Sequence, residues 1–164
     1  MTDEKKESAT RYHKKTMLAA ADRLLTEHGY DGMNMNMLSK EAGYSKATVY
    51  VYFESKDEIV RALCIERLKV VKSELAVIAK ADMSADEKFA EIKGVFDELS
   101  SEDKVYFDFI CERGVGASTE REIELKSLID DIIDGLTVIA DRQTLAEKWY
   151  SYYGRKKTAA LFGY

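Results

Sequence analysis

The chain has 164 residues, no proline and a net charge of −5, a composition rich in helix formers that predicts an all-α protein and argues against indiscriminate binding to nucleic acid. It carries neither a recognisable secretory signal nor an apolar stretch long enough to span a bilayer, so we expect a cytoplasmic protein that does not associate with a membrane. Cys64 and Cys111 share no metal-like spacing with each other or with His13 and His28, which predicts reduced, buried thiols, no metal site and no cofactor.

The N-terminal region is expected to begin as a frayed arm, because the first ten residues are all polar or small apart from the initiating methionine. A first helix is predicted from Arg11 to His28, and Gly29 is expected to end it. Its apolar side chains recur at the spacing of one helical face, at Met17, Ala20, Ala21, Leu24 and Leu25.

Two short helices joined by a tight turn are predicted next. The side-chain oxygen of Asn34 can accept a hydrogen bond from a free backbone N–H of the following turn, which indicates a helix from there to Ala42. Gly43 provides a residue that tolerates unusual backbone dihedrals in the turn. Ser45 is the predicted N-cap of the second short helix, residues 46–53.

The rest of the chain also reads as helices. The first of these helices, residues 56–81, is long and apolar on more than one side, which suits an element that packs against two groups of neighbours. Ser84, followed three residues later by Glu87, forms a capping box that opens another helix. The predicted ranges are 56–81, 84–99, an aromatic-rich helix over 101–113, 119–140 and 144–161.

The two short helices within residues 29–56, braced by the longer first helix, have the layout of a trihelical helix-turn-helix, in which the last short helix enters the major groove of DNA. Residues 11–56 carry seven basic and five acidic side chains, so this end of an acidic chain is mildly basic. Exposed donors in such a module contact phosphates and base edges. The candidate DNA-binding residues are Asn34, Asn36, Ser45, Lys46, Ala47, Thr48, Tyr50, Tyr52 and Lys56.

The same stretch resembles the signature of the tetracycline-repressor (TetR) family of bacterial regulators. The resemblance covers about the first third of the chain and needs no gap. Asn34 departs from it, because the family has a hydroxyl residue there. Val51 also departs, at a position that is often polar; we expect either one fewer contact with the DNA backbone or an apolar contact, such as one with a thymine methyl group. The matching residues are Gly29-Tyr30, Asn34, Leu38-Ser39, Ala42-Gly43-Tyr44-Ser45, Tyr50-Val51-Tyr52-Phe53 and Ser55-Lys56.

The resemblance implies a transcriptional regulator, a repressor that binds a pseudo-palindromic double-stranded DNA operator as a homodimer and responds to a small-molecule effector. It divides the chain into a helix-turn-helix domain, residues 1–55, and a helical domain for effector binding and dimerisation, residues 56–164. Trp149 is expected on the inner face of the last helix, near either the dimer seam or the effector pocket. The candidate pocket residues are Tyr106, Phe107, Phe109, Trp149 and Tyr153.

Two other classes of protein fit the sequence less well. An enzyme would need a phosphate-binding loop, a nucleophile with its base, or ligands at metal-like spacing, and none of these patterns is found. Asp130, Asp131 and Asp134 are interpreted as a solvated helix face and not as a metal cluster. A helical protein-binding adaptor without specific DNA recognition would explain the acidic C-terminal half but leaves the motif-bearing N-terminal third unexplained.

Overall fold

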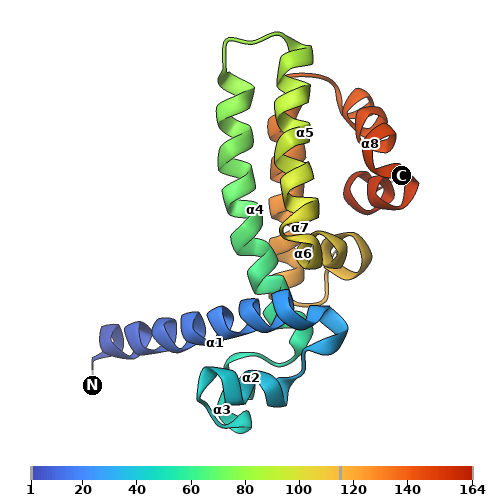
Figure 1. Ribbon diagram of the computed structural model, residues 1–164. Helices are drawn as coiled ribbons and strands as arrows, with labels where there is room; N and C mark the ends of the chain where they lie inside the picture. The colour runs from blue at the N-terminus through green and yellow to red at the C-terminus, as the bar shows by residue number, and fades with distance from the viewer. Residues whose placement is uncertain (1, 115, 164) are drawn as a thin grey trace. The chain divides into compact units, whose positions relative to one another are not determined.

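A computed structural model describes residues 2–114 and 116–163, and every regular element within these ranges is a helix (Figure 1). The all-α prediction is therefore confirmed. None of the described helices combines the length and the apolar character that crossing a bilayer requires. In chain order they are α1 (Asp3–Gly32), α2 (Met35–Ala42), α3 (Lys46–Tyr52), α4 (Lys56–Lys80), α5 (Ala85–Ser101), α6 (Lys104–Phe109), the π-helical turn η1 (Ile110–Gly114), α7 (Glu120–Leu136) and α8 (Arg142–Phe162).

The chain forms two compact units, Met1–Leu63 and Cys64–Tyr164, and the boundary falls inside α4. The functional boundary between residues 55 and 56 stays a prediction. In the first unit α1 packs against α2, and α2 against α3. The core of this unit takes fully buried side chains from all three helices, among them Met17, Ala20, Leu38 and Val49, and burying each large apolar side chain contributes roughly 1.5–3 kcal/mol.

The first helix begins at Asp3, so the prediction of a frayed arm over the first ten residues is wrong where the structure describes them. The segment lacks helix breakers before Gly29, and Asp3 and Glu4 lie in the first turn, where carboxylates interact favourably with the helix dipole. The predicted stop at Gly29 is confirmed: its φ of 72° and ψ of 177° interrupt the helix.

The caps of the two short helices are formed as predicted. The side chain of Asn34 accepts a hydrogen bond from the backbone N–H of Met37 at 3.0 Å, and that of Ser45 accepts from Thr48 at 3.1 Å. Gly43 lies between them in the left-handed region, with φ 76° and ψ 28°. The turn therefore needs glycine for its backbone conformation.

In the second unit the capping box of Ser84 and Glu87 is confirmed at the start of α5. The aromatic-rich helix is shorter than predicted, because the α-helix ends at Phe109 and continues as the wider turn η1. The next helix ends at Leu136 rather than at residue 140, and a second capping box, Thr119 with Glu122, fixes its start.

The last helix is divided in two at Gly154, which the sequence prediction of an unbroken helix missed. Gly154 has φ 80° and ψ 177°, outside the helical region, and the chain changes direction there (Figure 1). We refer to residues 155–162, the part of α8 after this break, as the C-terminal arm. It returns Phe162 to the core, where the phenyl ring is buried.

Candidate nucleic-acid interface

Helix α3 presents one uncovered side. Successive residues on a helix are separated by about 100°, so Lys46, Ala47, Tyr50 and Val51 share a face, opposite the fully buried Val49. All four are exposed, Tyr50 at 44% and Val51 at 80%. This face combines a cation, a phenol and two apolar groups, which are the kinds of side chain that contact phosphates, base edges and thymine methyl groups in a major groove.

The predicted polar residues at the helix starts lie on the surface or close to it. Asn34 and Asn36 are exposed at the beginning of α2, and Ser45 is exposed before α3. Thr48 is half-buried, and its hydroxyl lies 2.7 Å from the hydroxyl of Ser45. These side chains therefore surround the free N–H groups at two helix N-termini, where anions bind favourably.

Tyr52 is turned away from the exposed face of α3 and toward α1. It is half-buried, and its ring centroid lies 5.9 Å from that of His13. His13 in turn accepts or donates a hydrogen bond at Nδ1 with the hydroxyl of Tyr44, at 2.7 Å. Sequence reasoning missed His13, because Tyr44 and Tyr52 lie more than 30 residues away from it and leave no local signal.

Lys56 has an internal role in the structure. Its ammonium group donates to the backbone carbonyls of Tyr30 at 2.7 Å and Met33 at 3.1 Å, and it lies 4.0 Å from the centre of the Tyr30 ring. The Tyr30 hydroxyl donates to Asp57. Lys56 thus holds the start of α4 against the segment that follows the Gly29 break.

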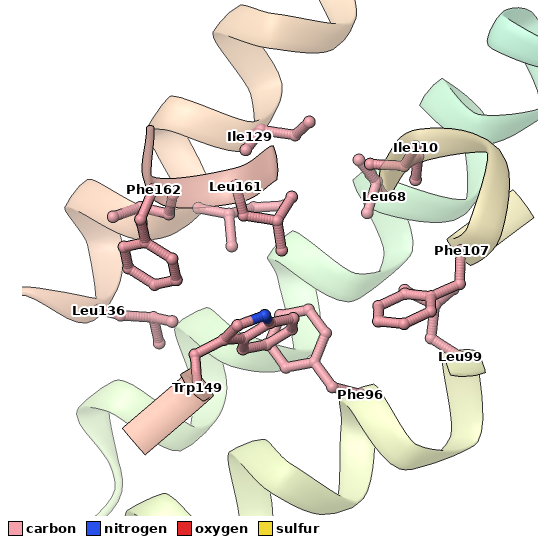
Figure 2. A pocket seen from close by; sticks show the side chains of 12 residues that line it. Leu68, Phe96, Leu99, Phe107, Ile110, Ile129, Leu136, Trp149, Leu161 and Phe162 are labelled. Atoms are coloured by element: carbon pink, nitrogen blue, oxygen red, sulfur yellow. The ribbon is translucent and has the colours of Figure 1, made fainter. Parts of the chain in front are cut away.

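In the second unit two of the predicted pocket residues, Phe107 and Trp149, line an apolar cavity of about 40 Å³ (Figure 2). Leu161 and Phe162 of the C-terminal arm also line it. A space of this size holds little more than a water molecule or two. The other lining residues are Leu68, Phe96, Leu99, Ile110, Ile129, Ile132, Ile133 and Leu136.

The indole of Trp149 is the polar exception in this apolar cavity. Its ring packs edge-on against Phe96, with centroids 4.4 Å apart. Its Nε1 is buried and has no hydrogen-bond partner among the residues that the structure describes, and Figure 2 shows this nitrogen on the edge of the ring that faces Leu161. A buried donor without an acceptor costs about 1–3 kcal/mol.

Tyr153 lies beside a second small cavity, of about 30 Å³, which Trp149 also lines. Its hydroxyl donates to Asp97 at 2.7 Å, and Lys93 also bonds to this carboxylate. The hydrogen bonds from Lys93 and from Tyr153 lower the pKa of Asp97, whereas burial raises the pKa of Tyr153. The remaining two predicted pocket residues, Tyr106 and Phe109, are buried but line neither cavity.

Among residues 2–114 and 116–163, no three His, Cys, Asp or Glu side chains are grouped as a metal site would require. Both cysteines are buried and unbridged, as predicted. The three aspartates of α7 each face a basic side chain: Asp130 faces Lys126 at 2.7 Å, Asp131 faces Lys72 at 2.8 Å, and Asp134 faces Arg142 at 3.8 Å.

This chain is similar to known proteins both in sequence and in fold. Residues 17–63 match the model of the bacterial regulatory proteins of the tetR family. An uncharacterised HTH-type transcriptional regulator of Mycobacterium bovis is 46% identical over 55 residues, which are 34% of this chain and 27% of that protein. The fatty acid metabolism regulator protein of Bacillus subtilis is 25% identical over 126 residues, 76% of this chain and 62% of that protein.

Among solved structures, the transcriptional regulator FadR from Bacillus subtilis in complex with stearoyl-CoA has a TM-score of 0.62 and 19% identity, over 90% of this chain and 84% of that one. This likeness is one of fold. The matched part of the chain spans about a quarter of the mycobacterial protein and less than two thirds of the Bacillus regulator.

Proposed function

Because residues 17–63 match the model of the bacterial regulatory proteins of the tetR family, we propose that the chain is a ligand-responsive transcriptional repressor that binds a pseudo-palindromic operator as a homodimer. The observation that carries this proposal is the uncovered face of α3, which lies in a capped and tightly turned helix pair. In a helix-turn-helix the corresponding helix lies in the major groove, and a dimer reads two half-sites about one helical turn apart, or a multiple of it.

Within this interface the residues have different roles. Lys46, Ala47 and Tyr50 face the groove from α3. Asn34, Asn36, Ser45 and Thr48 surround the two helix starts and bind phosphate there, because free backbone N–H groups favour an anion. Tyr52 contacts His13 and so positions α3. Lys56 is occupied by two backbone carbonyls and supports the module from inside.

The effector is proposed to enter the apolar cavity beside Trp149 as a molecule with a long apolar part, such as an acyl-CoA. The Bacillus FadR structure in complex with stearoyl-CoA supports this class of ligand, and so does the wholly apolar lining with a single unpartnered N–H. The cavity is too small for an acyl chain as it stands. Entry therefore requires side chains such as Leu161 and Phe162 to be displaced, and the proposed pivot of the arm that carries them is the break at Gly154.

Release of DNA follows if the ligand stabilises a conformation with lower operator affinity; a coupling of about 1–3 kcal/mol changes that affinity 5- to 150-fold. Helix α4 contributes residues to both compact units and is the proposed route of coupling.

The matched relatives are regulators, and we propose that this chain has no catalytic activity and acts in the cytoplasm. A protein-binding adaptor is not favoured, because it gives the DNA-binding segment no role.

The test is selection of a binding site from random duplex DNA by the purified protein, followed by gel-shift titration of the selected site at several salt concentrations. A regulator retards the selected duplex in the presence of excess bulk DNA, with an affinity that falls as salt rises. Enrichment of a two-fold symmetric sequence supports the dimer. Failure to enrich any sequence, or equal affinity for selected and bulk DNA, would overturn the proposed function.

A further inference from the structure

The first turns of α1 form a part of the molecule to which the proposed function assigns no role. Residues 3–9 are all exposed, yet they are helical and continuous with the rest of α1. Figure 1 shows this end of the helix running on beyond α2 and α3. Such an extension buries little apolar surface, so its contribution to the folded module is small.

Charge is distributed unevenly around this extension. At about 100° per residue, Lys5, Lys6, Ala9, Tyr12 and His13 fall within one side of the helix, an arc of roughly 120°. The acidic residues of the same turns, at positions 3, 4 and 7, lie outside that arc. We call the side formed by these five residues the basic face of α1.

The basic face continues into the module that carries the proposed DNA interface. The ring of Tyr12 meets that of His13 edge-on at 5.8 Å, and His13 contacts Tyr44 and Tyr52. Tyr12 is 67% exposed. Lys6 precedes His13 by seven residues, two helical turns or roughly 10 Å along the axis.

The lysines of this face have no acidic partner among the residues that the structure describes. Within the part of the chain that the structure describes, no ion pair or side-chain hydrogen bond involves Lys5 or Lys6. Their ammonium groups are therefore available to an external polyanion. A phosphate backbone fits better than an acidic protein surface, because the face adjoins a residue of α3 itself.

We propose that the basic face of α1 is a second DNA-contacting surface, which binds backbone phosphates flanking the base pairs that α3 reads. This inference rests on the proposed function. Lys5 and Lys6 neutralise phosphates, and the exposed hydroxyl of Tyr12 donates to one. Contacts of this kind supply affinity and register but carry no sequence information.

The experiment compares two double variants that remove the same charge from the same helix. Lys5→Ala/Lys6→Ala alters the basic face, whereas Arg11→Ala/Lys15→Ala alters exposed residues on the opposite side. Alanine is the best helix former, so both variants keep the helix. Affinity for a 40-bp duplex centred on the site selected by the wild-type protein is measured as a function of salt.

We expect Lys5→Ala/Lys6→Ala to reduce the slope of log K against log salt by about 0.9 for each lysine removed from the complex, with unchanged base preference, and the opposite-face variant to keep the wild-type slope. Trimming the duplex to the base pairs read by α3 should abolish the difference. Equal slopes for the two variants, or a difference that survives trimming, would overturn the proposal. If the wild-type protein selects no sequence, the proposed function fails and this inference with it.

Discussion

The hydroxyl of Tyr44 lies 2.7 Å from Nδ1 of His13, so the turn between α2 and α3 is tied directly to α1. The two rings also meet edge-on, with centroids 5.4 Å apart. Both residues are half-buried, which shields the hydrogen bond from competing water. The orientation of α3 on the module therefore depends on a contact between residues 31 positions apart.

Tyr44→Phe should lower both stability and operator affinity, because it removes the hydrogen bond and keeps the ring. We expect a loss of about 0.5–1.5 kcal/mol in the free energy of unfolding, measured by urea denaturation, together with weaker binding in a gel shift. Tyr150→Phe is the control, since Tyr150 is 56% exposed on α8. Wild-type affinity in the Tyr44 variant would mean that this contact does not position α3.

Lys46→Ala and Tyr50→Ala should weaken operator binding while leaving helicity and melting temperature nearly unchanged. Both side chains are exposed on the uncovered face of α3, and a specific contact is worth about 1–3 kcal/mol. Binding is measured by gel shift and stability by circular dichroism. Tyr150→Ala controls for the loss of an exposed tyrosine elsewhere. Either α3 variant binding as tightly as the wild type would show that this face has been assigned wrongly.

Gly43→Val should lower the melting temperature and, with it, DNA binding. A Cβ at Gly43 meets no atom within 4 Å, so we attribute the cost to the left-handed backbone, and a residue held there costs about 1–3 kcal/mol. Gly94→Ala is the matched control: Gly94 is helical and equally open, and alanine there should stabilise by about 0.5–1 kcal/mol. A melting temperature that shifts in the same direction in both variants would contradict the conclusion that the turn needs glycine at position 43.

The local parts of this fold could be predicted from the sequence, because each depends on residues a few positions apart. The caps at Asn34 and Ser45 and the turn at Gly43 are examples. The sequence predicts the start of α1 at Arg11 instead of Asp3. Charged helix formers occur both in solvated helices and in disordered arms, so their composition does not distinguish the two. The break at Gly154 has neither proline nor a cap beside it to mark it.

The candidate site could be predicted only in part. Lys46 and Tyr50 follow from the register of a short helix. Lys56 was expected at a phosphate, but its partners are backbone carbonyls 23 and 26 residues earlier, a relationship that only the folded chain reveals. The unpartnered Nε1 of Trp149 is equally invisible in the sequence, since it depends on the side chains that other elements of the second unit place around the ring.

Trp149 should report on ligand binding. It is the single tryptophan of the chain and is 7% exposed, so its emission should be blue-shifted in the folded protein. Adding stearoyl-CoA at fixed protein concentration should change that emission, whereas dilution should not. The opposite pattern, a response to dilution but not to stearoyl-CoA, would place the indole at a dimer seam and overturn the proposed pocket.

Cys111 should react slowly with iodoacetamide at pH 8, because burial raises the pKa of its thiol to about 11. The measurement uses a Cys64→Ala background, so that one thiol is counted, and unfolded protein in urea is the control. Since the folded pKa lies above the ordinary value of 9.0, the thiol's contribution to stability is present below pH 9 and is lost as pH rises toward 11. Equal rates in folded and unfolded protein would show that the thiol is accessible.

In the proposed complex, Val51 limits what α3 can distinguish. Val51 is 80% exposed, on the same face of α3 as Tyr50, and its isopropyl group can neither donate nor accept a hydrogen bond. In a major groove its apolar counterpart is the methyl group on C5 of thymine. A cytosine methylated at C5 carries the same group at the same place, so methylation of the operator at that position would strengthen the contact, and replacing thymine with uracil would remove it.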